Sequence, residues 1–165
     1  MKVALYIGDH KDDTLTVRAG WALTRLVQKG EFANVTHVEA IHTEHKDGSV
    51  DIASASIREG GVSVKEKVFL NPRHWLIVEV PKWSVRESRK WFIEHNGQKY
   101  DIRGAFASAL PIQWTQPNRW FCNHSIAEPF LKSAWIFGPA QFAAIVMSIG
   151  EDVTAEFFRA RYASF

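Results

Sequence analysis

Residues 34–41, with the sequence NVTHVEAI, alternate between apolar and polar side chains with a period of two. In a β-strand, successive side chains point to opposite faces of the sheet. The stretch therefore predicts a strand that carries Val38 and Ala40 on one face. His37 and Glu39 share the other face, where a carboxylate lies close to an imidazole.

Turn signals on the C-terminal side of this strand divide the sequence into further strands. Asp47-Gly48 is a strong hairpin signal, and Gly60-Gly61 marks the next turn. The pattern predicts additional strands at residues 3–7, 50–57, 62–69 and 75–80, with the sheet closing at Pro81.

Helical patterns surround these strands. Apolar spacing predicts a helix over residues 12–29, and Ser84 caps a second helix that runs to about residue 94. From residue 104 onward the pattern is mainly helical and is interrupted by prolines. This order predicts an α+β fold in which an antiparallel sheet packs against helices.

Length and composition fit one domain that spans residues 1–165. A chain of 165 residues with 46% hydrophobic and 23% charged residues is typical of a globular protein with a single core. The formal charge is only +2, and Lys and Arg are scattered along the chain, which gives no case for nucleic-acid binding. The sequence does not indicate an oligomeric state.

The chain shows no targeting or membrane-spanning pattern. Its opening apolar run meets Asp9 too early for the apolar region of a signal peptide. No stretch approaches the roughly 18 apolar residues of a transmembrane helix. We therefore expect a cytoplasmic protein at synthesis, although a phage-type lysis or injection route would carry it elsewhere.

Cys122 is the single cysteine, which excludes an intramolecular disulfide and a cysteine-based zinc site. A lone cysteine is often a small core residue. Here, however, a turn at Pro117-Asn118 precedes it and a plausible first helical turn follows it. Unpaired N–H groups at the start of a helix stabilise a thiolate, so Cys122 is a candidate nucleophile.

His37 is the best candidate for the base that would serve this thiol. Glu39 on the same strand face would hold the imidazole tautomer, as the third member of a triad does. Ser54 and Ser56 on the neighbouring strand are rival orienting groups. The alternative interpretation is a His–Glu pair on the solvated face of a strand.

Zinc binding by His37, Glu39, His42 and His45 is a weaker possibility. Strand alternation places His37 and His42 on opposite faces, which disfavours a shared ion. We expect no metal and no cofactor. His124, two residues after the cysteine on the same helix, would point away from the thiol.

At these residues the chain resembles the YiiX/YebB-like proteins, which are circularly permuted relatives of the NlpC-type, papain-fold cysteine hydrolases. In that family the histidine-bearing strand comes first and the cysteine-bearing helix comes late, as here. The matching motifs, which extend over about residues 20–130, are Thr36-His37-Val38-Glu39-Ala40, Gly20-Trp21-Ala22-Leu23-Thr24, Ala53-Ser54-Ala55, Gly60-Gly61-Val62, Lys99-Tyr100-Asp101 and Trp120-Phe121-Cys122.

The resemblance implies a permuted papain-like fold and acyl transfer with Cys122 as nucleophile, His37 as base and Glu39 as orienting group. The backbone N–H of Cys122 would contribute to an oxyanion hole. Tyr100 and Trp120 would contact substrate, although Tyr100 is equally well explained as a packed aromatic residue. The family often continues Cys-Ser-Glu, whereas this chain has Asn123-His124, so substrate contacts at the helix start differ.

The substrate class implied first is a peptide of the peptidoglycan type, cleaved at an amide bond. The alternative is an acyl-containing lipid, as in the permuted relative lecithin retinol acyltransferase, which would make the chain an acyltransferase or thioesterase. A third possibility is a binding module that retains the fold without the reaction. An apolar tunnel at Cys122 would favour lipid, and an open polar groove would favour peptide.

Overall fold

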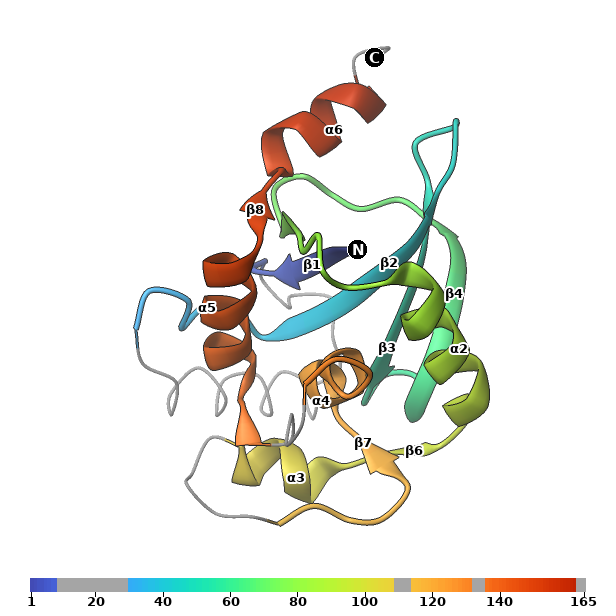
Figure 1. The fold of residues 1–165 in the computed structure, drawn as a ribbon, viewed down its shortest axis with the longest axis vertical. Helices are drawn as coiled ribbons and strands as arrows, with labels where there is room; N and C mark the ends of the chain where they lie inside the picture. The colour runs from blue at the N-terminus through green and yellow to red at the C-terminus, as the bar shows by residue number, and fades with distance from the viewer. Residues whose placement is uncertain (9–29, 109–113, 132–135, 163–165) are drawn as a thin grey trace.

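A computed structural model describes residues 1–8, 30–108, 114–131 and 136–162. Within these residues the chain forms a mixed α+β fold with one curled sheet (Figure 1). The helix predicted over residues 12–29, with the Gly20–Thr24 motif, lies outside the described residues.

The described part of the chain contributes eight strands to this sheet, in the order β7-β6-β4-β3-β2-β1-β5-β8. Their bounds are β1 Lys2–Tyr6, β2 His37–Glu44, β3 Val50–Ser56, β4 Gly61–Val68, β5 Trp75–Glu79, β6 Lys99–Tyr100, β7 Arg119–Trp120 and β8 Glu151–Asp152. The strand containing the histidine, β2, therefore lies near the middle of the sheet, between β1 and β3.

The central strands pair in antiparallel register. Leu5 of β1 pairs with Val38 of β2 on one side and with Leu76 of β5 on the other. Gly48 and Gly60, with φ of +85° and +76°, form the turns of the two hairpins that join β2, β3 and β4. Only glycine adopts this backbone region without steric cost, which explains the turn signals in the sequence.

Helices cover both faces of the sheet (Figure 1). Their bounds are α2 Val85–His95, α3 Ile102–Ala107, α4 Cys122–Ala127, α5 Pro139–Ile149 and α6 Thr154–Tyr162. Val38 and Ala40 belong to a core cluster with Ile126 of α4, whereas Ile41 packs in a second cluster with Phe157 of α6. Side chains of β2 thus contribute to two apolar clusters, whereas the sequence predicts a single core.

Most predicted elements are confirmed, with small shifts of their ends. Ser84 caps α2 as expected, since its side chain accepts a hydrogen bond from the Glu87 N–H at 3.3 Å. Two expectations are wrong. β6 and β7 form a parallel pair, and the sheet does not close at Pro81, because β6, β7 and β8 extend it. Strands of two residues are too short to show a periodicity in the sequence.

No helix in the described ranges combines the length and the apolar character needed to cross a bilayer.

Candidate active site

Cys122 is the first residue of α4. The short strand β7 leads into it, and the Asp101 N–H donates to Trp120 O at 2.9 Å, which fixes this approach. Phe121 in extended conformation occupies the N-cap without a capping side chain, so the first N–H groups of α4 lack the usual cap. The prediction that Cys122 begins a helix is confirmed.

The N-terminal end of α4 packs against the sheet at the point where β2 and β3 stop pairing. The ladder between these strands ends at the pair Ala40–Ala53. Beyond it, the Ala55 N–H donates to Ser125 Oγ of α4 at 3.1 Å, and Ser125 Oγ–H donates to Cys122 O at 2.8 Å. A helix side chain therefore replaces a strand partner, and this brings Cys122 to the start of β2.

His37, the first residue of β2, hydrogen-bonds both Cys122 and Glu39. Its Nε2 lies 3.0 Å from Glu39 Oε1, and because an ionised carboxylate only accepts, Nε2–H is the donor. This hydrogen bond holds the imidazole ring in a fixed orientation.

Glu39 and Cys122 are each only 2% exposed, and His37 is 9% exposed. The solvated-face interpretation of the His–Glu pair is therefore wrong. Lys65 of β4, which is partly exposed, also donates to Glu39 Oε1, at 2.8 Å. The buried carboxylate thus has two cationic neighbours, which offset the cost of taking its charge out of water.

These contacts determine the protonation states. Burial alone would lower the pKa of His37, but hydrogen bonds to Cys122 and Glu39, together with their charges, raise it from 6.5 to about 9. Burial would raise the pKa of Glu39, but the hydrogen bond and charge of His37, with Lys65, lower it from 4.5 to about 2. At neutral pH the pair is therefore an imidazolium and a carboxylate.

The structure narrows the choice of the residue that orients His37. Ser54 Oγ lies 3.4 Å from His37 Nε2, so Glu39 and Ser54 both contact the same nitrogen. Ser56 instead accepts a hydrogen bond from the Arg58 N–H at 3.1 Å. The shorter, charge-assisted contact is the one from Glu39.

Tyr100 belongs to the same hydrophobic cluster as Cys122 and is almost completely buried. Burial, followed by the negative charges of Cys122 and Asp101, raises the pKa of Tyr100 well above its ordinary value of 10. Its hydroxyl therefore keeps its proton and can act as a donor. Trp120 Nε1–H donates to Gln98 Oε1 at 2.6 Å, and the centroid of its ring lies 4.6 Å from that of His124.

Asn123 and His124, the two residues that follow the cysteine, have structural partners. Asn123 donates through Nδ2 to Phe137 O, and its Oδ1 lies 3.7 Å from Cys122 Sγ. His124 Nε2 lies 3.2 Å from Glu128 Oε2, and burial lowers the pKa of His124 to about 4. Asn123 thus ties α4 to the segment before α5.

The zinc set suggested by the sequence is not assembled. His42 lies inside β2, and its Nε2 is 2.9 Å from Ser88 Oγ, whereas His45 Nε2 is 2.7 Å from Asp51 Oδ1. Among the residues the structure describes, no group of three or more His, Cys, Asp or Glu side chains could hold a metal ion.

Sequence reasoning missed two residues of the candidate site, Lys65, which donates to Glu39, and Ser125, which donates to Cys122 O. Lys65 reaches Glu39 across β3, in a register where Lys65 pairs with Ile52 next to a bulge. Its position in an alternating strand is visible in the sequence, but the register that brings it to Glu39 is not.

A scan against models of protein families, a search of curated proteins and a search of solved structures found no significant match to this chain.

Proposed function

We propose that this chain is a cysteine hydrolase of the permuted papain-like kind, with Cys122 as nucleophile, His37 as base and Glu39 as orienting group. The observation that carries the proposal is the continuous chain of hydrogen bonds from Cys122 through His37 to Glu39. A positive imidazole in contact with a sulfur atom favours its thiolate form, which is the reactive one.

The proposed reaction has two halves, acylation of Cys122 and hydrolysis of the acyl thioester, and in each half the acyl carbon forms one bond and loses another. The thiolate of Cys122 attacks the carbonyl carbon of an amide, and the oxyanion that results accepts from backbone N–H groups at the start of α4. His37 gives its proton to the leaving amine, and an acyl thioester remains on Cys122. His37 then takes a proton from water, the hydroxide attacks the thioester, and a carboxylate leaves with regeneration of the thiolate.

The arrangement of elements supports the permuted fold within this proposal. The histidine strand β2 precedes the cysteine helix α4 in the chain, and α4 packs on β2 and β3. This is the order that the sequence resemblance implies. A peptidoglycan-type peptide is the first substrate class, and its amide bonds suit the reaction above.

A second substrate class is an acyl ester or thioester of a lipid. Cys122 belongs to the larger hydrophobic core cluster, with Phe121 and Val38 among its members. A thiol in apolar surroundings suits an acyl chain better than a charged peptide. The chemistry at Cys122 and His37 is the same for both classes.

The test is to trap the acyl-enzyme. The protein is incubated with muropeptides, with peptide amides and with long-chain acyl thioesters, and its intact mass is followed over time. We expect one substrate class to add a single acyl group to the wild type. The Cys122→Ala variant should gain no mass, and His37→Ala should gain it much more slowly.

Release of product, measured in the same incubations, shows whether the protein turns the substrate over. A mass increase that persists in Cys122→Ala would place the nucleophile elsewhere. No adduct and no product from any class, with a folded protein, would favour the binding-module alternative over a hydrolase.

A further inference from the structure

The face of the molecule formed by α3 and Trp114 exposes large apolar side chains. Ile102 and Phe106 lie one helical turn apart on α3 and are 51% and 46% exposed, and Trp114 is 58% exposed. The guanidinium of Arg103 lies 5.7 Å from the centroid of the Trp114 ring, which places Trp114 beside α3. We call Ile102, Arg103, Phe106 and Trp114 the α3 face.

The sequence from α3 onward carries charge of one sign. Between residues 102 and 127 it contains no Asp or Glu, whereas Arg103 and Arg119 lie in this span and the exposed Lys99 lies three residues before it. The carboxylate of Asp101, next to α3, is completely buried.

The α3 face is rigidly connected to the candidate active site. Asp101 Oδ1 accepts from the Gly104 N–H of α3 at 2.8 Å, and Oδ2 accepts from the Gln116 N–H, two residues after Trp114, at 3.0 Å. The neighbouring residue, Tyr100, pairs in β6 with Trp120, which lies two residues before Cys122.

We propose that the α3 face docks on the surface of an anionic phospholipid bilayer. Indole rings prefer the membrane interface, and exposed aliphatic and phenyl side chains insert among the acyl chains below it. Basic side chains at the rim are attracted to anionic headgroups. Both requirements are met here, and no exposed carboxylate in the span opposes them. The proposal goes beyond the proposed hydrolase function and would hold for a catalytically inactive protein.

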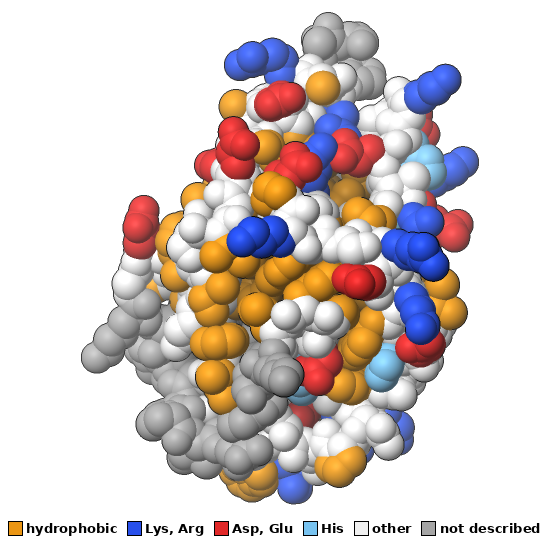
Figure 2. All heavy atoms as spheres, viewed as in Figure 1, with side chains coloured by type: hydrophobic (Ala, Val, Ile, Leu, Met, Phe, Trp, Pro, Cys, Tyr) orange, Lys and Arg blue, Asp and Glu red, His pale blue; other side chains and the backbone are white. Residues whose placement is uncertain are grey.

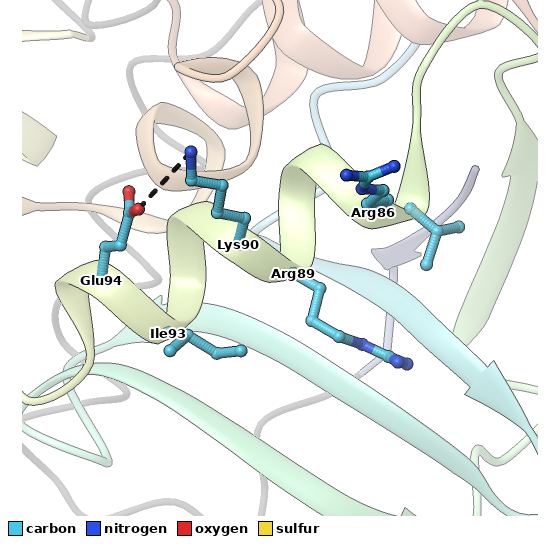
Figure 3. A pocket seen from close by; sticks show the side chains of 6 residues that line it. Arg86, Arg89, Lys90, Ile93 and Glu94 are labelled. Carbon is cyan, nitrogen blue, oxygen red and sulfur yellow. Dashed lines mark ion pairs between the residues drawn. The ribbon is translucent and has the colours of Figure 1, made fainter.

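Helix α2 provides a contrasting surface, where acidic and basic side chains are mixed (Figure 2). Its outer side has a depression lined by basic residues and Ile93, which is 66% exposed (Figure 3). Besides Arg86, Arg89 and Lys90, α2 carries Glu87 and Glu94, and Lys90 pairs with Glu94 at 3.8 Å. Because carboxylates lie among its basic residues, unlike in the span from residue 102 to 127, variants on α2 serve as matched controls.

The experiment is cosedimentation with vesicles of phosphatidylcholine alone and of phosphatidylcholine mixed with phosphatidylglycerol in equal parts. The wild type should bind the anionic vesicles. Trp114→Ser should weaken this binding by about tenfold, as expected for loss of one well-inserted side chain. Arg103→Glu should weaken it by about fivefold or more.

The matched controls are Ile93→Ser and Lys90→Glu on α2, which should bind like the wild type. Circular dichroism checks that each variant is folded, which we expect because all four side chains are exposed. Cys122→Ala should bind normally, which separates docking from catalysis. Absence of wild-type binding, or equal losses in the α2 and α3 variants, would overturn the proposal.

Discussion

Replacing Glu39 by Gln removes one negative charge from the candidate active site while it preserves the size of the side chain and a carbonyl that can accept from His37. Glu39 contributes a hydrogen bond and a charge to the raised pKa of His37, after the hydrogen bond from Cys122. We therefore expect the pKa of His37 to fall from about 9 towards its ordinary value of 6.5.

The size of the effect follows from these two values. The difference between 6.5 and about 9 corresponds to about 3 kcal/mol in favour of the imidazolium when both partners are present. Loss of the Glu39 charge should remove a substantial part of this. It also leaves Lys65 without its partner, but Lys65 is partly exposed and can be hydrated. We expect the free energy of unfolding at neutral pH to fall by about 1–3 kcal/mol.

The assay is a titration of the His37 ring followed by NMR, with urea unfolding of the same samples. Glu128→Gln is the matched control, because Glu128 pairs with His124 and not with His37. It should leave the His37 titration unchanged. A His37 that still titrates near 9 in Glu39→Gln would refute the role assigned to Glu39.

Three further predictions concern the scaffold. Because folding raises the pKa of His37 and lowers that of Glu39, the pair should stabilise the fold most between about pH 4.5 and 6.5. In urea unfolding, this stabilisation should decrease towards pH 9 as His37 loses its proton, and towards pH 2 as Glu39 gains one. Gly61→Ala should separate β4 from β6 and lower both the melting temperature and any activity, because its Cβ would overlap Gln98 O. Ser84→Ala should cost about 1 kcal/mol in urea unfolding and leave activity unchanged, because it removes only the α2 cap.

The local features of the site could be predicted from the sequence. Alternation in residues 34–41 places His37 and Glu39 on one face, and the two side chains do hydrogen-bond each other. The turn before Cys122 and the polar residues after it predict a helix start, which α4 confirms. Both features depend on neighbouring residues, whose geometry periodicity describes well.

The long-range features could not be predicted in this way. Which strands neighbour β2 depends on the crossover that inserts β1 between β2 and β5. The contact between Lys65 and Glu39 depends on a strand register with a bulge. At the end of the β2–β3 ladder, the side chain of Ser125 accepts the hydrogen bond that a backbone carbonyl of the neighbouring strand would otherwise accept. No periodicity in the sequence indicates this contact.

The most direct test of the Cys122–His37 pair is the pH dependence of Cys122 alkylation by iodoacetamide in the wild type and in His37→Ala. Cys122 is the single cysteine, so the total adduct measured by mass spectrometry reports on this thiol alone. We predict that the folded wild type reacts much faster than the variant at neutral pH, because the imidazolium of His37 is lost from the variant. An unreactive thiol in the folded wild type, or identical profiles in both proteins, would contradict the assignment of Cys122 as a nucleophile paired with His37.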